Sequence, residues 1–159
     1  MSQVRSRLAR MMRLEEITFD NVAAACRIQV GPDQEKYVAP VAWSLAAAYT
    51  TPQTAWPRLI RDGDTAVGFI MGNFDPHNEF EGFRCGIWRL NIAAEHQGRG
   101  YGRFAVEELL AEARRRGNTR ATVYWVADGD HSPEKFYLKL GFRPTGEVMG
   151  HEVEGELFL

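Results

Sequence analysis

The fold of this chain is decided by the stretch Leu90-Asn91-Ile92-Ala93-Ala94-Glu95-His96-Gln97-Gly98-Arg99-Gly100-Tyr101-Gly102. Its first residues end an apolar run that reads as a strand, and a short loop then leads into glycines that open a helix. The unpaired N–H groups of a helix's first turn, with the positive end of the helix dipole, form a site for a phosphate or pyrophosphate. Each hydrogen bond from an N–H group to a charged phosphate oxygen contributes roughly 1.5–3 kcal/mol. Several such hydrogen bonds can therefore anchor a nucleotide-like ligand without a lysine.

Other interpretations of this stretch are a glycine-rich turn without a ligand and a dinucleotide site. The spacing Gly100-x-Gly102-x-x-Ala105 fits the loose dinucleotide-binding pattern. However, no acidic residue stands where the ribose partner is expected. A P-loop is excluded because the sequence contains no Gly-Lys-Ser or Gly-Lys-Thr.

Outward from this stretch, the pattern predicts a strand, helices, three strands, a helix, a strand, a helix and two strands. Predicted strands cover residues 13–18, 58–61, 66–71, 85–92 and 121–126, and two closing strands flank Gly150. Predicted helices cover 22–30, 35–37, 44–49 with Ser44 as N-cap, 100–116 and 133–140. In the strand over 85–92, alternation places Trp88, Leu90 and Ile92 on one face and Arg89 and Asn91 on the other.

The composition is that of one globular domain. We expect a loose extension over residues 1–11 and a single domain over 12–159, because 159 residues, 45% of them hydrophobic, can bury one core. A net charge of −2 produces no long-range positive field that would attract a nucleic-acid backbone, so we expect no nucleic-acid partner. No apolar run approaches membrane length, so we expect no membrane association and a soluble, cytoplasmic protein. We expect Cys26 and Cys85 to be free thiols, and the four histidines lack the spacing of a metal site, so no metal is implied.

Two motifs in the right order resemble those of the GNAT acetyltransferases. Gln97, Gly100 and Gly102 match the family's central signature of Gln or Arg, two residues, Gly, one residue, then Gly or Ala. The second signature matches Phe136-Tyr137-Leu138-Lys139-Leu140-Gly141-Phe142. A predicted helix and strand separate the motifs, and the resemblance extends over roughly residues 66–150.

The resemblance implies an α/β (α+β) GNAT fold: a mixed, mostly antiparallel sheet, splayed between its fourth and fifth strands and flanked by helices. It also implies that the chain binds acetyl-CoA in that gap. By the same resemblance, the backbone of Leu90, Asn91 and Ile92 holds the pantetheine arm. The residues expected at the pyrophosphate are Gln97, Gly98, Arg99, Gly100, Tyr101, Gly102 and Arg103. Tyr137 would protonate the departing thiolate, while Asp130 replaces an Asn that contacts CoA in many relatives.

The resemblance further implies an N-acetyltransferase that acts on a primary amine by direct transfer in a ternary complex. A softer resemblance to the bacterial spermine/spermidine acetyltransferases makes a polyamine the expected acceptor. Carboxylates and aromatic faces suit such a polycation, and the candidate acceptor residues are Asp33, Tyr37, Glu81, Glu152 and Glu154. Candidates for the general base are Glu79, Glu81, Glu152, Glu154 and Glu156, because relatives that carry a base on the fourth strand have Glu where this chain has Trp88.

Two alternatives stay open at this point: an acetyltransferase for another small amine, amino acid or peptide, and a CoA-binding module that transfers nothing. The absence of a Glu on the fourth strand and the replacement of the usual Asn by Asp130 favour the module, whereas the glycines and Tyr137 favour the enzyme. We also expect that a homodimer is possible, since dimers are frequent among the relatives.

Overall fold

The computed structural model describes residues 11–159. Its strands are β1 (Met12–Glu16), β2 (Ala55–Asp62), β3 (Thr65–Phe74), β4 (Cys85–Ile92), β5 (Arg120–Val126), β6 (Arg143–Met149) and β7 (Glu152–Phe158). Its helices are α2 (Val22–Cys26), α3 (Val41–Thr50), α4 (Tyr101–Arg115) and α5 (Glu134–Leu140), with 3-10 helices η1 (Pro32–Tyr37), η2 (Glu81–Phe83) and η3 (Ala94–His96). This order confirms the predicted succession of elements.

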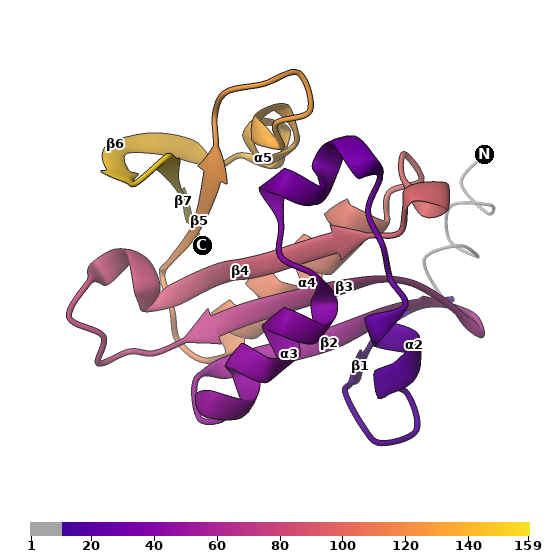
Figure 1. Ribbon diagram of the computed structural model, residues 1–159. Coiled ribbons are helices and arrows are strands. Elements are labelled where there is room, and N and C mark those ends of the chain that lie inside the picture. Colours follow the sequence, from indigo (N-terminus) through magenta and orange to yellow (C-terminus); the bar gives the residue numbers. More distant parts are fainter. Residues whose placement is uncertain (1–10) are drawn as a thin grey trace, which may run out of the picture.

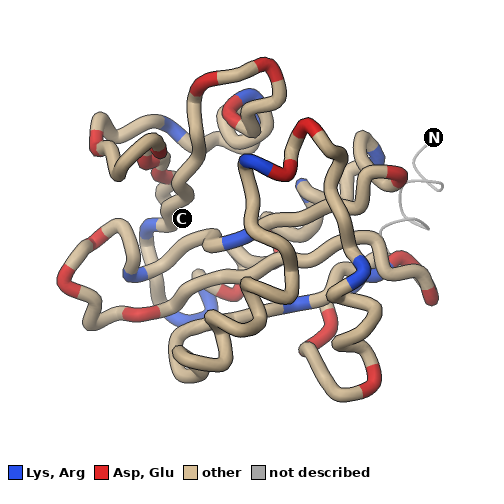
Figure 2. Tube along the Cα trace, in the orientation of Figure 1, with Lys and Arg blue, Asp and Glu red and all other residues tan. Residues whose placement is uncertain are grey.

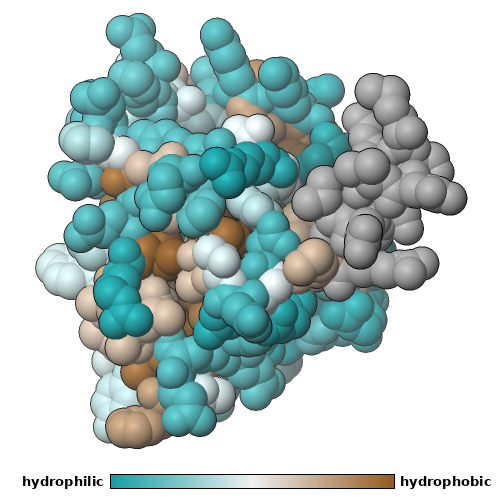
Figure 3. Space-filling view, turned by 90° about the vertical axis from the view of Figure 1, so that its right-hand side faces the viewer, coloured by the Kyte–Doolittle hydropathy of each residue, from teal (hydrophilic) through white to brown (hydrophobic). Residues whose placement is uncertain are grey.

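The strands form one sheet in the order β1-β2-β3-β4-β5-β7-β6, in which all neighbours are antiparallel except β4 and β5 (Figure 1). Each face carries its own apolar core, because alternate residues of a strand point to opposite faces. Ile60 and Ile70 face the core under α4, whereas Leu59, Phe69 and their neighbours face the core under α2 and α3. On the surface drawn in Figure 3, apolar atoms form small areas between hydrophilic ones.

Two α-helices differ from their predicted bounds by three residues or more, and hydrogen bonds account for both differences. The prediction carried α2 to residue 30, but it ends at Cys26, and the carbonyl of Gln29 then accepts a hydrogen bond from the N–H of Ala94. The prediction started α3 at Ser44, but it begins at Val41, because the carbonyl of Pro40 already accepts from Ser44 in the first turn. The neighbouring strands β2 and β3 pair in antiparallel fashion, as do β6 and β7.

The sheet is splayed between β4 and β5, as predicted. Among the described residues the two strands pair only at Gly86 with Thr122 and at Ile87 with Val123. A β-carbon on Gly86 would lie 2.3 Å from the carbonyl oxygen of Thr122, so the close approach requires glycine at this position. After Ile87 the β5-facing edge of β4 is therefore unpaired.

A β-bulge at Trp88 corrects the predicted faces of β4. Arg89 pairs with Met71 and Ile87 pairs with Gly72, so Trp88 has no partner of its own on β3. Ile87 and Leu90 face the core under α4, while Trp88 packs against the core under α2 and α3. The prediction that Trp88 shares a face with Leu90 and Ile92 is wrong, because the inserted residue shifts the alternation by one.

Candidate active site in the cleft between β4 and β5

The start of α4 has the geometry of an anion site. Gly98 and Gly100 adopt φ angles of +73° and +88°, and a β-carbon on either would meet nothing within 4 Å. The first bond at this end of the helix joins the N–H of Phe104 to the carbonyl of Gly100, which leaves the preceding N–H groups of the first turn without helical partners. The first turn holds no acidic side chain. These groups fit a pyrophosphate.

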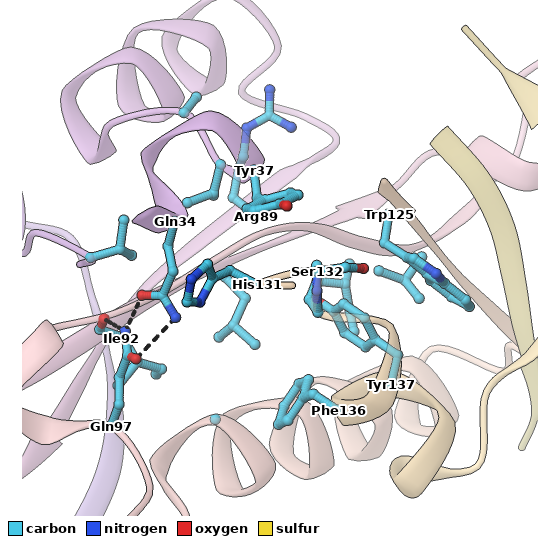
Figure 4. A pocket seen from close by; sticks show the side chains of 18 of the residues that line it. Gln34, Tyr37, Arg89, Ile92, Gln97, Trp125, His131, Ser132, Phe136 and Tyr137 are labelled. Atoms are coloured by element: carbon cyan, nitrogen blue, oxygen red, sulfur yellow. Dashed lines mark hydrogen bonds between the residues drawn. The ribbon is translucent and has the colours of Figure 1, made fainter. Parts of the chain in front are cut away.

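A cavity of about 1120 Å³ extends from this turn along the unpaired part of β4 to α5. Its walls bring together both sequence motifs, because Gln97 and Gly100 line one end and Tyr137 lines the other. Leu90 and Ile92 line the β4 side. Figure 4 shows side chains from η1, β4, β5 and α5 converging on this space. The cavity therefore occupies the place that the sequence assigned to the donor substrate.

Gln97 connects the glycine turn to β4 and to η1. Its side-chain N–H donates to the carbonyl of Ile92 over 3.0 Å and to Oε1 of Gln34 over 2.6 Å. Gln34 donates back to Oε1 of Gln97 over 3.0 Å, and Figure 4 shows the pair. The amide of Gln97 thus fixes the turn, and in this structure it is not directed at the phosphate site.

The 3-10 helix η1 covers the cleft, and we call its residues 32–37 the roof. Its Tyr37 hydroxyl donates to the carbonyl of Asp128, in the loop after β5, over 3.2 Å. In the same loop Nε2 of His131 lies 3.7 Å from Oδ2 of Asp33. Together with the Gln34 amide pair, these contacts join the roof to both sides of the cleft.

Tyr137 lies in an aromatic cluster on α5. Its ring is stacked on Trp125 with centroids 5.7 Å apart, and it makes edge contacts with Phe136 and Phe142. Burial raises the pKa of the Tyr137 phenol, because desolvation disfavours the phenolate. The side chain is therefore a neutral O–H at the wall of the cavity. Ser132 sets the start of α5, since its Oγ donates to the carbonyl of Val126 and accepts from the N–H of Glu134.

A second cavity of about 490 Å³ adjoins the first at the bulge of β4. The residues that line both cavities are Ile87, Trp88, Arg89, Tyr124 and Glu152. Asn73 and Asp75 line the second cavity but not the first. The splayed sheet therefore offers two adjoining spaces, as a reaction between two bound substrates requires.

Most of the predicted site residues line the first cavity. They are Tyr37, Leu90, Ile92, Gln97, Gly98, Gly100, Tyr101, Gly102, Arg103, Tyr137 and Glu152. Six others line neither cavity: Asp33, Glu81, Asn91, Arg99, Asp130 and Glu154. The backbone of Asn91 stays on β4, but its side chain donates to the carbonyl of Ala39 on the opposite face.

Three of the predicted acceptor carboxylates have partners within the protein. Glu154 is buried, accepts from the hydroxyl of Tyr124 and pairs with Arg120 over 2.9 Å. Oε1 of Glu81 lies 3.7 Å from Nη1 of Arg84. The carboxylate of Asp33 lies near His131 in the loop after β5. Figure 2 shows acidic residues gathered on the C-terminal hairpin, but of this hairpin's carboxylates only Glu152 lines a cavity in the described structure.

Sequence reasoning did not assign a role to Gln34, Tyr124, Trp125, His131 or Ser132. Gln34 has no local signal, because its partner Gln97 is 63 positions away. Ser132 stands before a proline and an acidic residue, which is a helix-start signal that could have placed its side chain. Within residues 11–159 no group of three His, Cys, Asp or Glu side chains is placed to hold a metal ion. None of the helices described has the length and apolar character needed to span a bilayer.

Comparison with known proteins identifies the family. The model of the acetyltransferase (GNAT) family matches residues 11–142. An acetyltransferase from Thermus thermophilus has a similar structure, with a TM-score of 0.68 at 20% identity over 94% of this chain and 97% of that one. PaiA N-acetyltransferase from Thermoplasma acidophilum, solved with coenzyme A, gives 0.68 at 12% identity over 93% and 99%.

The ribosomal-protein-S18-alanine N-acetyltransferase from Escherichia coli gives a TM-score of 0.66 at 16% identity, over 93% of this chain and 94% of that one. Identities this low establish the shared fold and nothing finer. No curated protein matches the chain. The family match covers most of the sequence and includes both motifs that line the cavity. The chain therefore belongs to the GNAT family of acetyltransferases, which use acetyl-CoA as donor.

Proposed function

We propose that the protein transfers the acetyl group of acetyl-CoA directly to a primary amine while both substrates are bound. The meeting of two cavities at the β4 bulge carries this proposal, because Tyr137 lines the first cavity and Glu152 lines both. A donor in the first cavity and an amine in the second would meet at this point. Bringing two reactants together in this way removes much of the entropic barrier of the reaction.

On the donor side, the α4 turn holds the pyrophosphate and the unpaired edge of β4 holds the pantetheine arm. The N–H groups along that edge are free to bind the carbonyls of an extended ligand, as a neighbouring strand would. The same N–H groups stabilise negative charge on the carbonyl oxygen under attack, which is where preorganised donors contribute most to catalysis. In this proposal Leu90, Asn91 and Ile92 act through their backbone.

Tyr137 supplies a proton to the departing sulfur. Burial raises the pKa of the phenol, so it carries its proton throughout the ordinary pH range. Negative charge develops on the leaving sulfur, and a protonated hydroxyl beside it can neutralise that charge by donating its proton. The stacking on Trp125 and the edge contacts with two phenylalanines hold the ring in place.

Glu152 is the best-placed general base. Of the five carboxylates that the sequence offered, it is the one that lines both cavities in the described structure. A carboxylate can accept the ammonium proton directly or through one water molecule. Its place at the beginning of β7, across the cleft from β4, supports a role for it on the acceptor side.

A polyamine is one acceptor class that these features support. The second cavity contains the carboxylates of Asp75 and Glu152 together with the ring of Trp88. Carboxylates attract cationic amines, and aromatic faces attract them further. Spermidine and spermine therefore belong among the first amines to be assayed.

The test is thiol release from acetyl-CoA over a panel of polyamines, amino acids, peptides and aminoglycosides. We expect Tyr137→Phe to lower kcat about 10²- to 10⁴-fold, the usual contribution of a general acid. Acetyl-CoA affinity should change little, because phenylalanine keeps the ring contacts. Unchanged kcat would remove Tyr137 from the mechanism. Tight acetyl-CoA binding without release by any amine would instead indicate a CoA-binding module.

A further inference from the structure

Arg89 is a positive charge at the junction of the two cavities. It lies on β4 beside the bulge and lines both cavities, and Figure 4 labels it among the side chains around the first cavity. Trp88 packs beside it, with the guanidinium carbon 5.6 Å from the centre of that ring. The function proposed above gives this side chain no task.

The described residues leave this charge without a close counter-ion. No carboxylate among residues 11–159 lies within 4.0 Å of the Arg89 guanidinium, whereas several other arginines have such a partner. Its Nη1 donates to the carbonyl of Trp88 over 3.0 Å, and its Nε is buried without a hydrogen-bond partner. Burial lowers the pKa of Arg89, yet arginine stays protonated in proteins at neutral pH. An unpaired, partly buried cation is unfavourable unless a ligand supplies an anion.

The donor substrate does not supply that anion. Its phosphates belong at the start of α4, beyond the end of β4 at Ile92. Arg89 lies three positions before Ile92, which is about 10 Å along β4. The part of the donor that would pass Arg89 is the uncharged pantetheine arm and its thioester. Any anion at Arg89 must therefore come from the acceptor.

We propose that Arg89 binds a carboxylate of the acceptor, so that the substrate is a small amine that also carries a carboxylate group, such as an amino acid. This inference rests on the proposed function and narrows its acceptor. Glu152 lies near enough to influence Arg89 electrostatically without forming an ion pair. A junction with one acidic and one basic side chain suits a zwitterion better than a polycation, because Arg89 repels additional ammonium groups.

The reaction balances with these groups. The neutral amine nitrogen forms the N–C bond to the acetyl carbonyl as the C–S bond breaks. Glu152 accepts the first proton, which the ammonium group loses before attack, and the Tyr137 hydroxyl gives its proton to sulfur. The second proton leaves nitrogen after the N–C bond has formed and replaces the one that Tyr137 gave, directly or through water. Solvent then takes the proton on Glu152. The acceptor carboxylate stays on Arg89 throughout and takes no part in bond making.

Matched amines that differ only in the carboxylate test this inference. Lysine and cadaverine form one pair, and ornithine and putrescine form another. Thiol release by the full chain should give a kcat/KM about 10- to 100-fold higher for the amino acid in each pair, the range of a hydrogen-bonded charge pair. Arg89→Met should bring that ratio close to 1. Arg114→Met removes an exposed arginine on α4 and should leave the ratio as in the wild type.

Equal or better use of the diamines by the wild-type protein overturns the inference and leaves the acetyltransferase proposal standing, with polyamines favoured. A fall in kcat for every amine alike in Arg89→Met, with the ratio kept, also overturns it, because Arg89 would then act on the transition state rather than on the acceptor. No thiol release with any amine overturns the proposed function and this inference with it. Thermal stabilisation of each variant by acetyl-CoA checks that the variant is folded.

Discussion

Gly100 and Gly117 allow a matched test of the anion site, because they lie at opposite ends of the same helix. Their φ angles are +88° and +82°, and a β-carbon on either would meet nothing within 4 Å. Alanine at each position should therefore impose the same backbone strain, roughly 1–2 kcal/mol, without a steric clash. In a chain of this length each kcal/mol lowers Tm by about 2–4 °C. The two variants should lose similar stability.

Only the Gly100→Ala variant should lose affinity for acetyl-CoA. Gly100 lines the cavity, and the methyl group of Gly100→Ala would occupy open space there. This is the place where the phosphate approaches the N–H groups of the first helical turn. Losing one hydrogen bond to a charged oxygen costs roughly 1.5–3 kcal/mol, which raises Kd roughly 10- to 150-fold. Gly117→Ala should bind acetyl-CoA as the wild type does.

Calorimetric titration with acetyl-CoA, with thermal unfolding of the same samples, measures both effects. Equal Kd values for Gly100→Ala and the wild type, with the expected fall in Tm, would refute the assignment of the pyrophosphate to this turn. A comparable loss of affinity in Gly117→Ala would show that strain in α4, rather than contact at its start, controls binding.

Three further predictions concern other parts of the molecule. Burial raises the pKa of Cys85 to about 11, so a thiol reagent at pH 8 should titrate the exposed Cys26 alone until the protein is unfolded, and two rapid equivalents in the native protein would contradict this. A hydrogen bond from Arg61 is the main cause that lowers the pKa of Glu15; its stabilising effect is therefore present above the unfolded pKa and lost as the pH falls through the folded one. The Tm difference between wild type and Glu15→Gln should accordingly shrink between pH 7 and pH 3, and a constant difference would argue against the pairing. Gly86→Ala would press a methyl group against a β5 carbonyl 2.3 Å away, so it should destabilise the fold by about 1–3 kcal/mol in denaturant unfolding, and an unchanged midpoint would show that the strands can separate.

The sequence predicted the order of elements and the donor end of the site because those depend on local signals. Glycines with positive φ, an amphipathic helix after them and a glycine at the end of α5 each leave a pattern within a few residues. The splay between β4 and β5 was predicted through the family resemblance, and the short pairing of these strands confirms it.

What depends on register or on distant partners was not predictable in this way. The bulge at Trp88 changes which side chains of β4 face the cleft, and nothing in a single strand's sequence marks the inserted residue. Glu152 and Glu154 are two positions apart on one strand and looked equivalent, yet only one lines a cavity, because Arg120 and Tyr124 from β5 bind the other. Such partners belong to a different strand, so the pattern of β7 alone cannot distinguish the two carboxylates.

The short pairing of β4 with β5 also divides the work of the molecule along the chain. The glycine turn, β4 and the roof all precede Gly117, whereas Tyr137, Trp125 and Glu152 all follow it, so each side of the cleft is one continuous segment of the sequence. A bound substrate that touches both segments adds attraction across the place where the sheet has few hydrogen bonds of its own. Substrate binding and the cohesion of the two segments are then linked, and the enzyme is most stable when its catalytic groups are in use.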